Sequence, residues 1–168
     1  MMLGLMLGLA GAVTGAGTAL AQDPGGLSAA EIEQILAIHN RERAEVGTPP
    51  LTWSTEVSAH AGEWARTLQG EGCGLRHRDQ GRKYGENIAD LINPGYPAAT
   101  APERWAEEKQ DYNGEAIGDP ESMNPWHYTQ MVWRNTTELG CGVAWCGENG
   151  ILICNYNPGG NVSGEKPY

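Results

Sequence analysis

Charged side chains are missing from the first 22 residues, and Asp23 is the first to appear. This stretch is apolar and rich in glycine. It ends in Ala19-Leu20-Ala21, a small-residue pattern typical of a signal-peptide cleavage site. We therefore expect a signal peptide over residues 1–21, although its usual basic start is lacking. The alternative is an uncleaved membrane anchor, which the weak hydrophobicity disfavours. We expect no later segment to span a membrane.

Positive charge is scarce in this chain. It has 11 Lys and Arg residues against 21 Asp and Glu residues, and its formal net charge is -10. An acidic surface repels phosphate backbones, so nucleic acid is not an expected partner. The same surface permits cation binding but identifies no particular ligand.

Several motifs that indicate a particular chemistry are also absent. The sequence has no Gly-x-Ser-x-Gly nucleophile motif, no phosphate-binding or dinucleotide glycine pattern and no His-Glu-x-x-His zinc motif. Its acidic residues are not spaced like a calcium-binding loop. Pattern alone indicates an exported α+β domain with an inward-facing carboxylate and imidazole, and it identifies no nucleophile.

No Cys-x-x-Cys pair occurs, which argues against a cysteine-based zinc site. Four cysteines in an exported chain more often form two disulfides. Three pairings are possible, and spacing alone does not choose between them. Cys146 and Cys154 flank a predicted hairpin and are plausible partners, which would pair Cys73 with Cys141.

Capping patterns organise the rest of the chain into a short linker at 22–27 and one domain at 28–168. Ser28 with Glu31, and Thr100 with Glu103, have the spacing of capping boxes, and Ser54 can cap a further helix. We expect helices over about 28–47, 54–70, 100–112 and 126–133. The segments "CGVAW" and "ILICNY" around a Gly/Asn turn predict a β-hairpin, giving an α+β fold with a small antiparallel sheet.

One carboxylate falls on the inward face of a predicted helix. Glu108 shares a stripe with Ala101, Trp105 and Tyr112. An inward carboxylate needs a partner, a proton or a metal, so Glu108 is a functional candidate; the alternative is a structural role, with a partner such as Arg or as a backbone cap. In "WHYTQMVW", His127 begins the next helix.

The other histidines differ in their surroundings. His39 completes the apolar stripe of the first helix and is expected to be a hydrogen-bonded core residue. His60 lies off its helix's apolar stripe and is expected at the surface. His77 lies in an irregular segment between Arg76 and Arg78. By spacing alone, His77 with His127 is only a weak metal-site hypothesis.

Five ordered motifs resemble the CAP superfamily of cysteine-rich secretory, antigen 5 and pathogenesis-related 1 proteins. They are "HNRERAEVGTPPLTW", "GENIA", the segment from Trp105 to Glu108, "WHYTQMVWRNTTELGC" and "ILICNYNPGGNV". The similarity runs from about residue 30 to Tyr168 and is strongest to the single-domain pathogenesis-related 1 branch. It implies an α-β-α sandwich with a small antiparallel sheet between helices.

The resemblance also implies a cavity built from His77, Glu86, Glu108 and His127. The two histidines could hold zinc or another divalent cation, with the glutamates nearby. The implied disulfides are again Cys73–Cys141 and Cys146–Cys154. Two positions near the cavity depart from the family pattern: Arg78 replaces a common Ser, and Trp126 replaces a small or charged residue.

By resemblance, the function we expect is a secreted, extracellular binding or effector module for a sterol or other lipid, periplasmic if the source is bacterial. We expect a monomer with transient membrane contact. Tyr96, Tyr112 and Trp126 are the candidate lipid-contacting residues. One alternative is a metal-dependent hydrolase in which Glu86 or Glu108 is catalytic. Another is a structural or partner-binding surface protein.

The last residues resemble a plant pattern in which a peptide beginning at Pro158 is released as a signal. The alternative, which we favour for a source outside plants, is that this tail packs and ends the domain, because its Gly, Pro and Asn content is explained by turns.

Overall fold

The protein is described by a computed structural model that covers residues 22–120 and 125–168. The expected signal peptide at 1–21 lies outside these residues. Among the described residues, no helix is long and apolar enough to cross a membrane. The elements in chain order are α1 (Ala29–Glu45), β1 (Thr52–Trp53), α2 (Thr55–Gly70), β2 (Gly85–Ile92), α3 (Thr100–Glu107), the 3-10 helix η1 (Glu108–Asp111), α4 (Trp126–Met131), β3 (Glu138–Cys146) and β4 (Asn149–Asn157).

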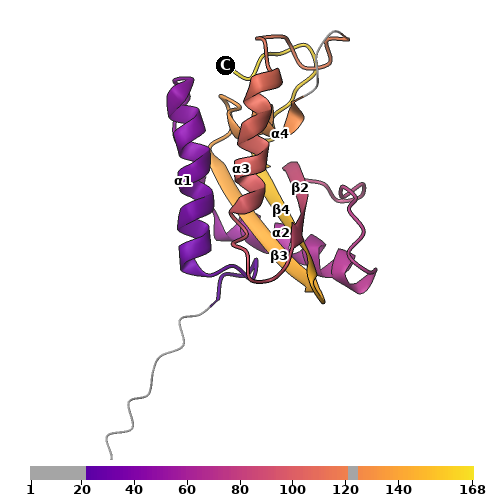
Figure 1. Ribbon diagram of the computed structural model, residues 1–168. Coiled ribbons are helices and arrows are strands. Elements are labelled where there is room, and N and C mark those ends of the chain that lie inside the picture. The colour runs from indigo at the N-terminus through magenta and orange to yellow at the C-terminus, as the bar shows by residue number, and fades with distance from the viewer. Residues whose placement is uncertain (1–21, 121–124) are drawn as a thin grey trace, which may run out of the picture.

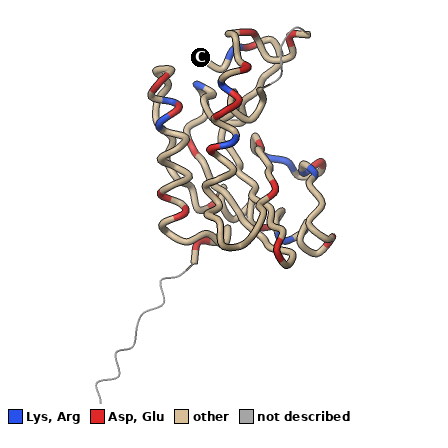
Figure 2. The backbone as a smooth tube through the Cα atoms, in the orientation of Figure 1, with Lys and Arg blue, Asp and Glu red and all other residues tan. Residues whose placement is uncertain are grey.

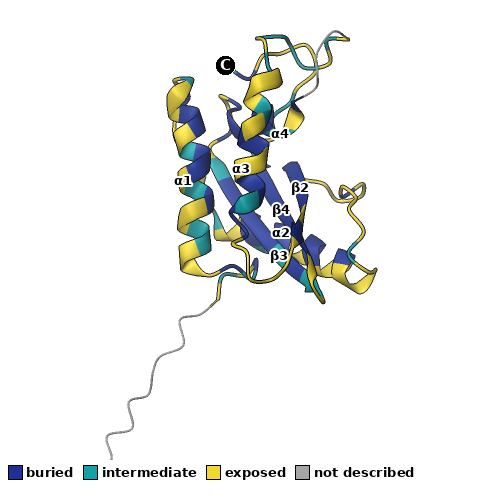
Figure 3. Cartoon of the chain, viewed as in Figure 1, coloured by how far each residue is buried: buried dark blue, intermediate teal, exposed yellow. Residues whose placement is uncertain are grey.

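The helices cover both faces of a single sheet (Figure 1), so the fold is the expected α-β-α sandwich. Helix α2 packs on one face, where it forms a core with Ile151 and Ile153 of β4. Helices α1, α3 and α4 cover the other face, around Leu139 and Leu152. Figure 3 shows the buried sides of α1 and α3 turned toward the sheet and their outer sides exposed.

The sheet has the order β1-β3-β4-β2. Strands β3 and β4 form the predicted hairpin, and β2 pairs antiparallel with β4. The small sheet is antiparallel, as expected, except at one edge, where the two-residue strand β1 runs parallel to β3. Between β1 and β3 the chain forms α2, β2, α3, η1 and α4, and a strand of two residues carries no sequence pattern that would indicate so distant a pairing.

Helix α2 approaches β3 closely because both carry glycine at the contact. A Cβ atom on Gly142 would lie 2.3 Å from the backbone nitrogen of Gly62. Such a distance is far inside van der Waals contact, so a side chain at Gly142 would push α2 away from the sheet.

The expected starts of the first two helices are confirmed. At α1, Ser28 Oγ accepts from the Glu31 backbone N–H. The Glu31 carboxylate in turn accepts from the Ser28 backbone N–H at 2.8 Å. Ser54 caps α2 by accepting from the Val57 N–H.

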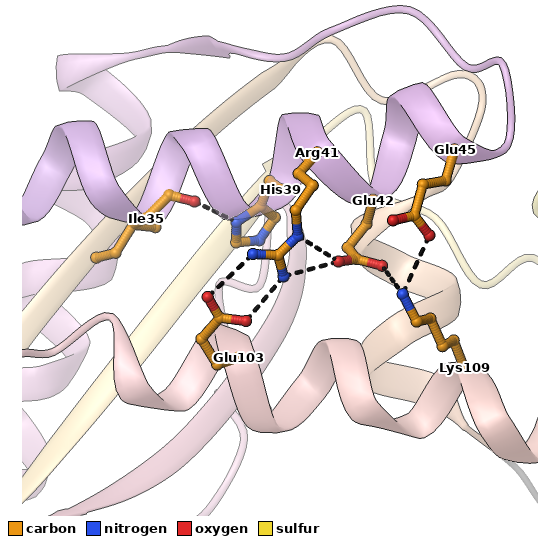
Figure 4. A network of polar contacts seen from close by, with 7 residues as sticks. All are labelled: Ile35, His39, Arg41, Glu42, Glu45, Glu103 and Lys109. Atoms are coloured by element: carbon orange, nitrogen blue, oxygen red, sulfur yellow. Dashed lines mark hydrogen bonds and ion pairs between the residues drawn. The ribbon is translucent and has the colours of Figure 1, made fainter.

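The capping box expected at Thr100 was wrong. Helix α3 begins after Ala99 without a side-chain cap. Glu103 instead forms a two-pronged ion pair with Arg41 of α1, at 2.8 and 3.1 Å (Figure 4). Side-chain spacing predicted a local contact, but a cation from another helix offers Glu103 a stronger partner.

All four cysteines form disulfides, but the expected pairing was wrong. The bonds join Cys73 to Cys146 and Cys141 to Cys154. The register of the hairpin explains the difference. Cys141 lies directly opposite Cys154, with their Cα atoms 4.0 Å apart, whereas Cys146 lies opposite Asn149 at the turn. Cys146 is therefore out of reach of Cys154 and meets Cys73 just after α2.

Residues 22–27, expected to be a linker, pack against the edge of β3. Gly25 O accepts from the Val143 N–H at 2.9 Å. Asp23 bonds to Ser58 and to the Trp53 indole, and Leu27 is fully buried. These contacts make the segment part of the folded domain, with Leu27 in its core.

Candidate functional site

The four residues expected to form a cavity do line one. Its volume is about 460 Å³, and its walls come from the segment after α2, from β2, η1 and α4, and from the C-terminal tail. The lining residues are His77, Arg82, Glu86, Asn87, Glu108, Ile117, Trp126, His127, Gln130, Gly160 and Asn161. Residues separated by more than 80 positions in sequence therefore meet at one site.

The histidines and glutamates form two separate pairs. His77 Nδ1 lies 2.8 Å from Glu86 Oε1, and His127 Nδ1 lies 2.6 Å from Glu108 Oε1. An ionised carboxylate only accepts hydrogen bonds, so each ring carries its proton on Nδ1 when neutral. This leaves Nε2 of both rings without its proton and able to bind a ligand. The same arrangement of carboxylate and imidazole orients many metal-binding histidines.

The two pairs differ in burial. The Glu86 side chain is 1% exposed and the Glu108 side chain is 28% exposed, while their partners His77 and His127 are 49% and 37% exposed. Burial acts to raise the pKa of Glu86. The hydrogen bonds from the His77 ring and the Arg78 backbone N–H, together with the charge of His77 and a contact with Asn155, outweigh it and hold this pKa below its ordinary value. Glu86 is therefore held as a carboxylate.

Glu108 supplies the cap that α4 lacks. Pro125 precedes α4 and provides no side-chain hydrogen bond. The Glu108 carboxylate accepts from the backbone N–H groups of His127 at 3.0 Å and Tyr128 at 3.2 Å. A negative charge at this end also suits the helix dipole. The inward carboxylate noticed in the sequence therefore has a structural role as well as a place in the cavity.

The opposite end of α4 is held by a residue that sequence analysis missed. Arg43 of α1 is fully buried and donates to the carbonyl oxygens of Met131, Trp133 and Thr136 at 2.8 to 3.0 Å. Burial lowers the pKa of Arg43 to about 10. Of the three residues whose carbonyls accept, Met131 is the last residue of α4, and a cation at the C-terminal end of a helix is favourable. The only sequence signal was a charged residue adjoining the inward stripe of α1.

The ring of His127 has a further contact. It stacks on Trp105 of α3, with ring centroids 5.6 Å apart and planes 10° from parallel. Asn87 of β2 donates to the backbone carbonyl of His127 at 3.0 Å. Asn87 was also missed, although a polar residue inside the buried strand "GENIADLI" is a signal that could have found it.

The candidate lipid-contacting residues do not gather at one place. Trp126 lines the cavity and is 53% exposed, with its carbonyl held by Asn161 of the tail. Tyr112 packs against Tyr128 and Tyr168, and its hydroxyl donates to Glu115 O. Tyr96 lies away from the cavity.

Tyr96 borders a second hollow, of about 400 Å³, beside the end of β2. Ile92 and Tyr96 are both largely exposed there. A third hollow, of about 340 Å³, lies between α1 and the start of α3 and is lined mainly by small or apolar residues, including Ala37, Ile38 and Pro97. Thr100 lines both, so the two hollows adjoin.

Charge is distributed unevenly around the cavity. Figure 2 shows a cluster of basic residues on the segment between α2 and β2, in a chain that is acidic overall. This segment carries Arg76, Arg78, Arg82 and Lys83. Arg82 reaches the cavity wall.

The chain offers few metal ligands. Within residues 22–120 and 125–168, no group of three or more His, Cys, Asp or Glu side chains could hold a metal ion. The two imidazoles fit the role of an incomplete ligand pair, whose remaining positions would be filled by water or another ligand. They do not provide the four protein ligands of a structural zinc site.

The remaining histidines have clear partners. His39 is fully buried, as expected, with Nδ1 2.8 Å from Ile35 O and Nε2 2.8 Å from the Tyr156 hydroxyl. His60 was expected at the surface, but it is only partly exposed and bonds to Asn155 and Arg78. The sheet and the segment after α2 approach this side of the helix, which its own periodicity did not predict.

The tail from Pro158 is packed into the domain. Thr136 donates to Pro158 O at 2.8 Å, and Gln130 accepts from the Gly160 N–H at 2.9 Å. Arg134 donates its backbone N–H to Pro167 O at 2.8 Å. Gly160 and Asn161 line the cavity, so the tail is one of its walls.

The fold and the site together define a class of protein: an α-β-α sandwich with two disulfides, in which two His/Glu pairs line one cavity. The family model of the cysteine-rich secretory protein (CAP) family matches residues 36–156, and the chain belongs to this family.

Similar proteins agree with this assignment. Pathogenesis-related protein 1A of Nicotiana tabacum is 40% identical over 137 residues, which are 81% of this chain and 80% of that protein. Pathogenesis-related protein PRMS of Zea mays is 40% identical over 139 residues, covering 81% of both chains.

Solved structures share the fold. The crystal structure of NaASP2 with Zn2+ is 26% identical and has a TM-score of 0.71, covering 85% of this chain and 87% of that one. Venom allergen-like protein 4 of Schistosoma mansoni is 30% identical with a TM-score of 0.62, covering 84% and 95% of the two chains.

Proposed function

We propose that this protein is an extracellular binding module for a sterol or another elongated lipid. One observation carries the proposal: the apolar hollow between α1 and α3 adjoins a second hollow with Ile92 and Tyr96 exposed at its rim. Exposed apolar side chains next to a groove are typical of a ligand site. The disulfides fit an oxidising compartment.

A binding assay with labelled cholesterol and palmitate, on protein beginning at residue 22, tests this proposal. We expect Ile92→Ser with Tyr96→Ser to weaken binding at least tenfold, because about 1.4 kcal/mol of apolar contact corresponds to that factor. Ala99→Trp should weaken binding by filling the hollow beside α1. Val162→Ser, an exposed apolar residue of the tail, is the matched control.

Comparing the Trp126→Ala variant with the Ile92 and Tyr96 double variant tests where the lipid binds. Loss of binding in Trp126→Ala but not in the Ile92 and Tyr96 variant would place the ligand in the His/Glu cavity instead. Absence of saturable binding to either lipid in the unmodified protein would refute the lipid proposal.

A second candidate function is binding of zinc or another divalent cation by His77 and His127. It is favoured by the Nδ1 contacts with Glu86 and Glu108, which leave both Nε2 atoms available. A bound cation would add a Lewis acid to the cavity; the residues themselves orient the rings and balance charge. Calorimetric titration with Zn2+ should give binding that His77→Ala with His127→Ala abolishes and His60→Gln retains.

These contacts favour binding over hydrolysis. A general base works best when its pKa lies near the operating pH, whereas the pKa of Glu86 is lowered. Glu108 already accepts three hydrogen bonds from His127 and Tyr128. Metal-dependent cleavage of casein that disappears in Glu108→Gln would contradict this view.

A further inference from the structure

A chain of hydrogen-bonded side chains leads from behind the cavity to Glu86. Arg78 Nη1 lies 3.1 Å from His60 Nε2, and His60 Nδ1 lies 3.0 Å from Asn155 Oδ1. Asn155 Nδ2 lies 3.5 Å from Glu86 Oε2. His60, Arg78 and Asn155 come from α2, the following segment and β4, and they do not line the cavity.

The chemistry of these groups gives the chain one direction. A guanidinium only donates hydrogen bonds, so His60 Nε2 accepts from Arg78 Nη1 at 3.1 Å; the Gly81 carbonyl lies farther from the same nitrogen, at 3.3 Å. The His60 proton then lies on Nδ1 and is donated to Asn155 Oδ1. The amide group of Asn155 is thereby turned so that its nitrogen faces Glu86 Oε2 and Gly85 O, at 3.5 and 3.3 Å, and both accept. In this direction every contact along the chain joins a donor to an acceptor. The opposite His60 tautomer would donate to Gly81 O but would turn a ring N–H toward the Arg78 guanidinium.

Burial makes this arrangement costly to disturb. The Arg78 side chain is 9% exposed, and its Nε atom is buried without a hydrogen-bond partner. Its second terminal nitrogen donates to the His60 carbonyl at 3.3 Å, and its guanidinium lies 5.3 Å from the centre of the Trp64 ring. The ion pair with Glu63 is long, at 3.6 Å. The contacts with His60 are therefore a large part of what compensates the buried cation.

Arg78 also contacts Glu86 directly. Its backbone N–H donates to Glu86 Oε1 at 3.1 Å, next to the bond from His77 Nδ1 at 2.8 Å. One carboxylate oxygen thus receives His77 and the Arg78 backbone, and the other receives Asn155. Three donors from three directions leave the carboxylate little freedom to rotate.

We propose that His60, Arg78 and Asn155 are positioning residues that fix the Glu86 carboxylate and, through it, the orientation and tautomer of His77. This gives a role to Arg78, a residue that departs from the family pattern. The role concerns the cavity itself and does not require that a metal or a lipid binds there.

Nitrogen-15 spectra of the imidazole rings test the proposal in metal-free protein at about pH 8.5, above the ordinary titration range of histidine. In the unmodified protein, His60 and His77 should both carry the proton on Nδ1. In His60→Phe and in Asn155→Leu, the difference between the two ring nitrogen shifts of His77 should shrink as its tautomers mix. His60→Gln, whose amide can both accept and donate, should restore the original His77 spectrum.

His127 is the internal control, because its partner Glu108 is outside this chain of contacts. A general loss of packing would change both rings, whereas loss of positioning changes His77 alone. Two results would overturn the proposal: a His60 proton on Nε2 in the unmodified protein, or an unchanged His77 spectrum in folded Asn155→Leu. Failure of lipid or zinc binding would not affect either reading.

Discussion

At the scale of single residues, burial decides which titratable groups influence stability. His39 lies in the core between Ile35 O and the Tyr156 hydroxyl, and Asn87 joins the same hydroxyl to the carbonyl of His127. Burial lowers the pKa of His39 from 6.5 to about 4, opposed by the bond to Ile35 and assisted by the charge of Arg43. His39 is therefore neutral in the folded protein near neutral pH.

This shift predicts a loss of stability in acid. Because the unfolded chain takes up the proton near pH 6.5 and the folded protein only near pH 4, His39 contributes no loss above pH 6.5. As the pH falls from 6.5 to 4, the free energy of unfolding should decrease by about 3 kcal/mol on account of this residue. Urea unfolding at several pH values measures it.

The matched variant is His39→Gln, which keeps a polar side chain but does not titrate. Its free energy of unfolding should be lower near neutral pH and should depend less on pH between 6.5 and 4. Parallel curves for the two proteins in this range would contradict the assignment.

At the scale of elements, α4 shows why short helices depend on the rest of the fold. Six residues are too few to form a stable isolated helix. Glu108 accepts from the N–H groups of its first turn, and Arg43 donates to the carbonyl of its last residue, Met131, and to that of Trp133 just beyond it. The cavity histidine His127 sits between these two contacts, so the ends of α4 determine where its ring lies.

Glu108→Gln should therefore reduce both stability and order at His127. The amide keeps an acceptor but loses the charge at the helix start, and we expect a loss of about 1 to 2 kcal/mol in the free energy of unfolding. Glu107→Gln is the control, because Glu107 is exposed and adjacent. Chemical denaturation of both variants gives the comparison; equal effects would show that Glu108 does not cap α4.

The disulfides also belong to this scale. The Cys73–Cys146 bond closes a loop of 73 residues and ties the start of the His77 segment to the end of β3, whereas Cys141–Cys154 closes 13 residues within the hairpin. Peptide mapping without reduction should recover these two pairs. Removing Cys73–Cys146 by paired Ser substitutions should cost about 4 kcal/mol, against about 3 kcal/mol for the shorter loop, by loop entropy alone.

Substitution of the hairpin pair provides the comparison. Cys141 and Cys154 are fully buried, so their replacement by Ala rather than Ser avoids burying hydroxyl groups. Recovery of a Cys146–Cys154 peptide would refute the pairing described above.

At the scale of the whole molecule, distant segments close the structure around the cavity. An ion network joins α1 to η1: Glu42 is buried and contacts Arg41 and Lys109, and Lys109 also contacts Glu45 (Figure 4). The tail joins α4 to the segment at Ile117, which donates to Glu165 O at 2.8 Å. The helices and loops on this side of the sheet are therefore bonded to one another as well as packed on the sheet.

Ending the chain after Asn157 should consequently destabilise the domain and open its cavity. The truncation removes the tail's hydrogen bonds to Thr136, Gln130, Arg134 and Ile117, each worth about 1 kcal/mol, so we expect a loss of about 2 to 4 kcal/mol. Thermal unfolding measures this, with Val162→Ser in the full chain as control. An unchanged midpoint would mean that the tail contributes little to stability.

Much of the fold was predictable because its signals are local. The capping residues Ser28 and Ser54, the apolar stripe of α2 and the Gly/Asn turn of the hairpin all act within a few positions, and each was confirmed. The errors lie where a distant partner competes with a local one. Glu103 forms an ion pair with Arg41 instead of capping α3, and Cys146 forms a disulfide with Cys73 instead of Cys154.

The sequence by itself determined the helices and hairpin, the inward face of Glu108 and, through its ordered motifs, membership of the CAP family. Only the tertiary structure decided the disulfide pairing, the contacts of Arg43 with α4 and the link from His60 to Glu86. The physical reason is that periodicity and capping depend on neighbours along the chain. Buried ions and disulfides instead depend on which distant groups the packed layers bring within reach.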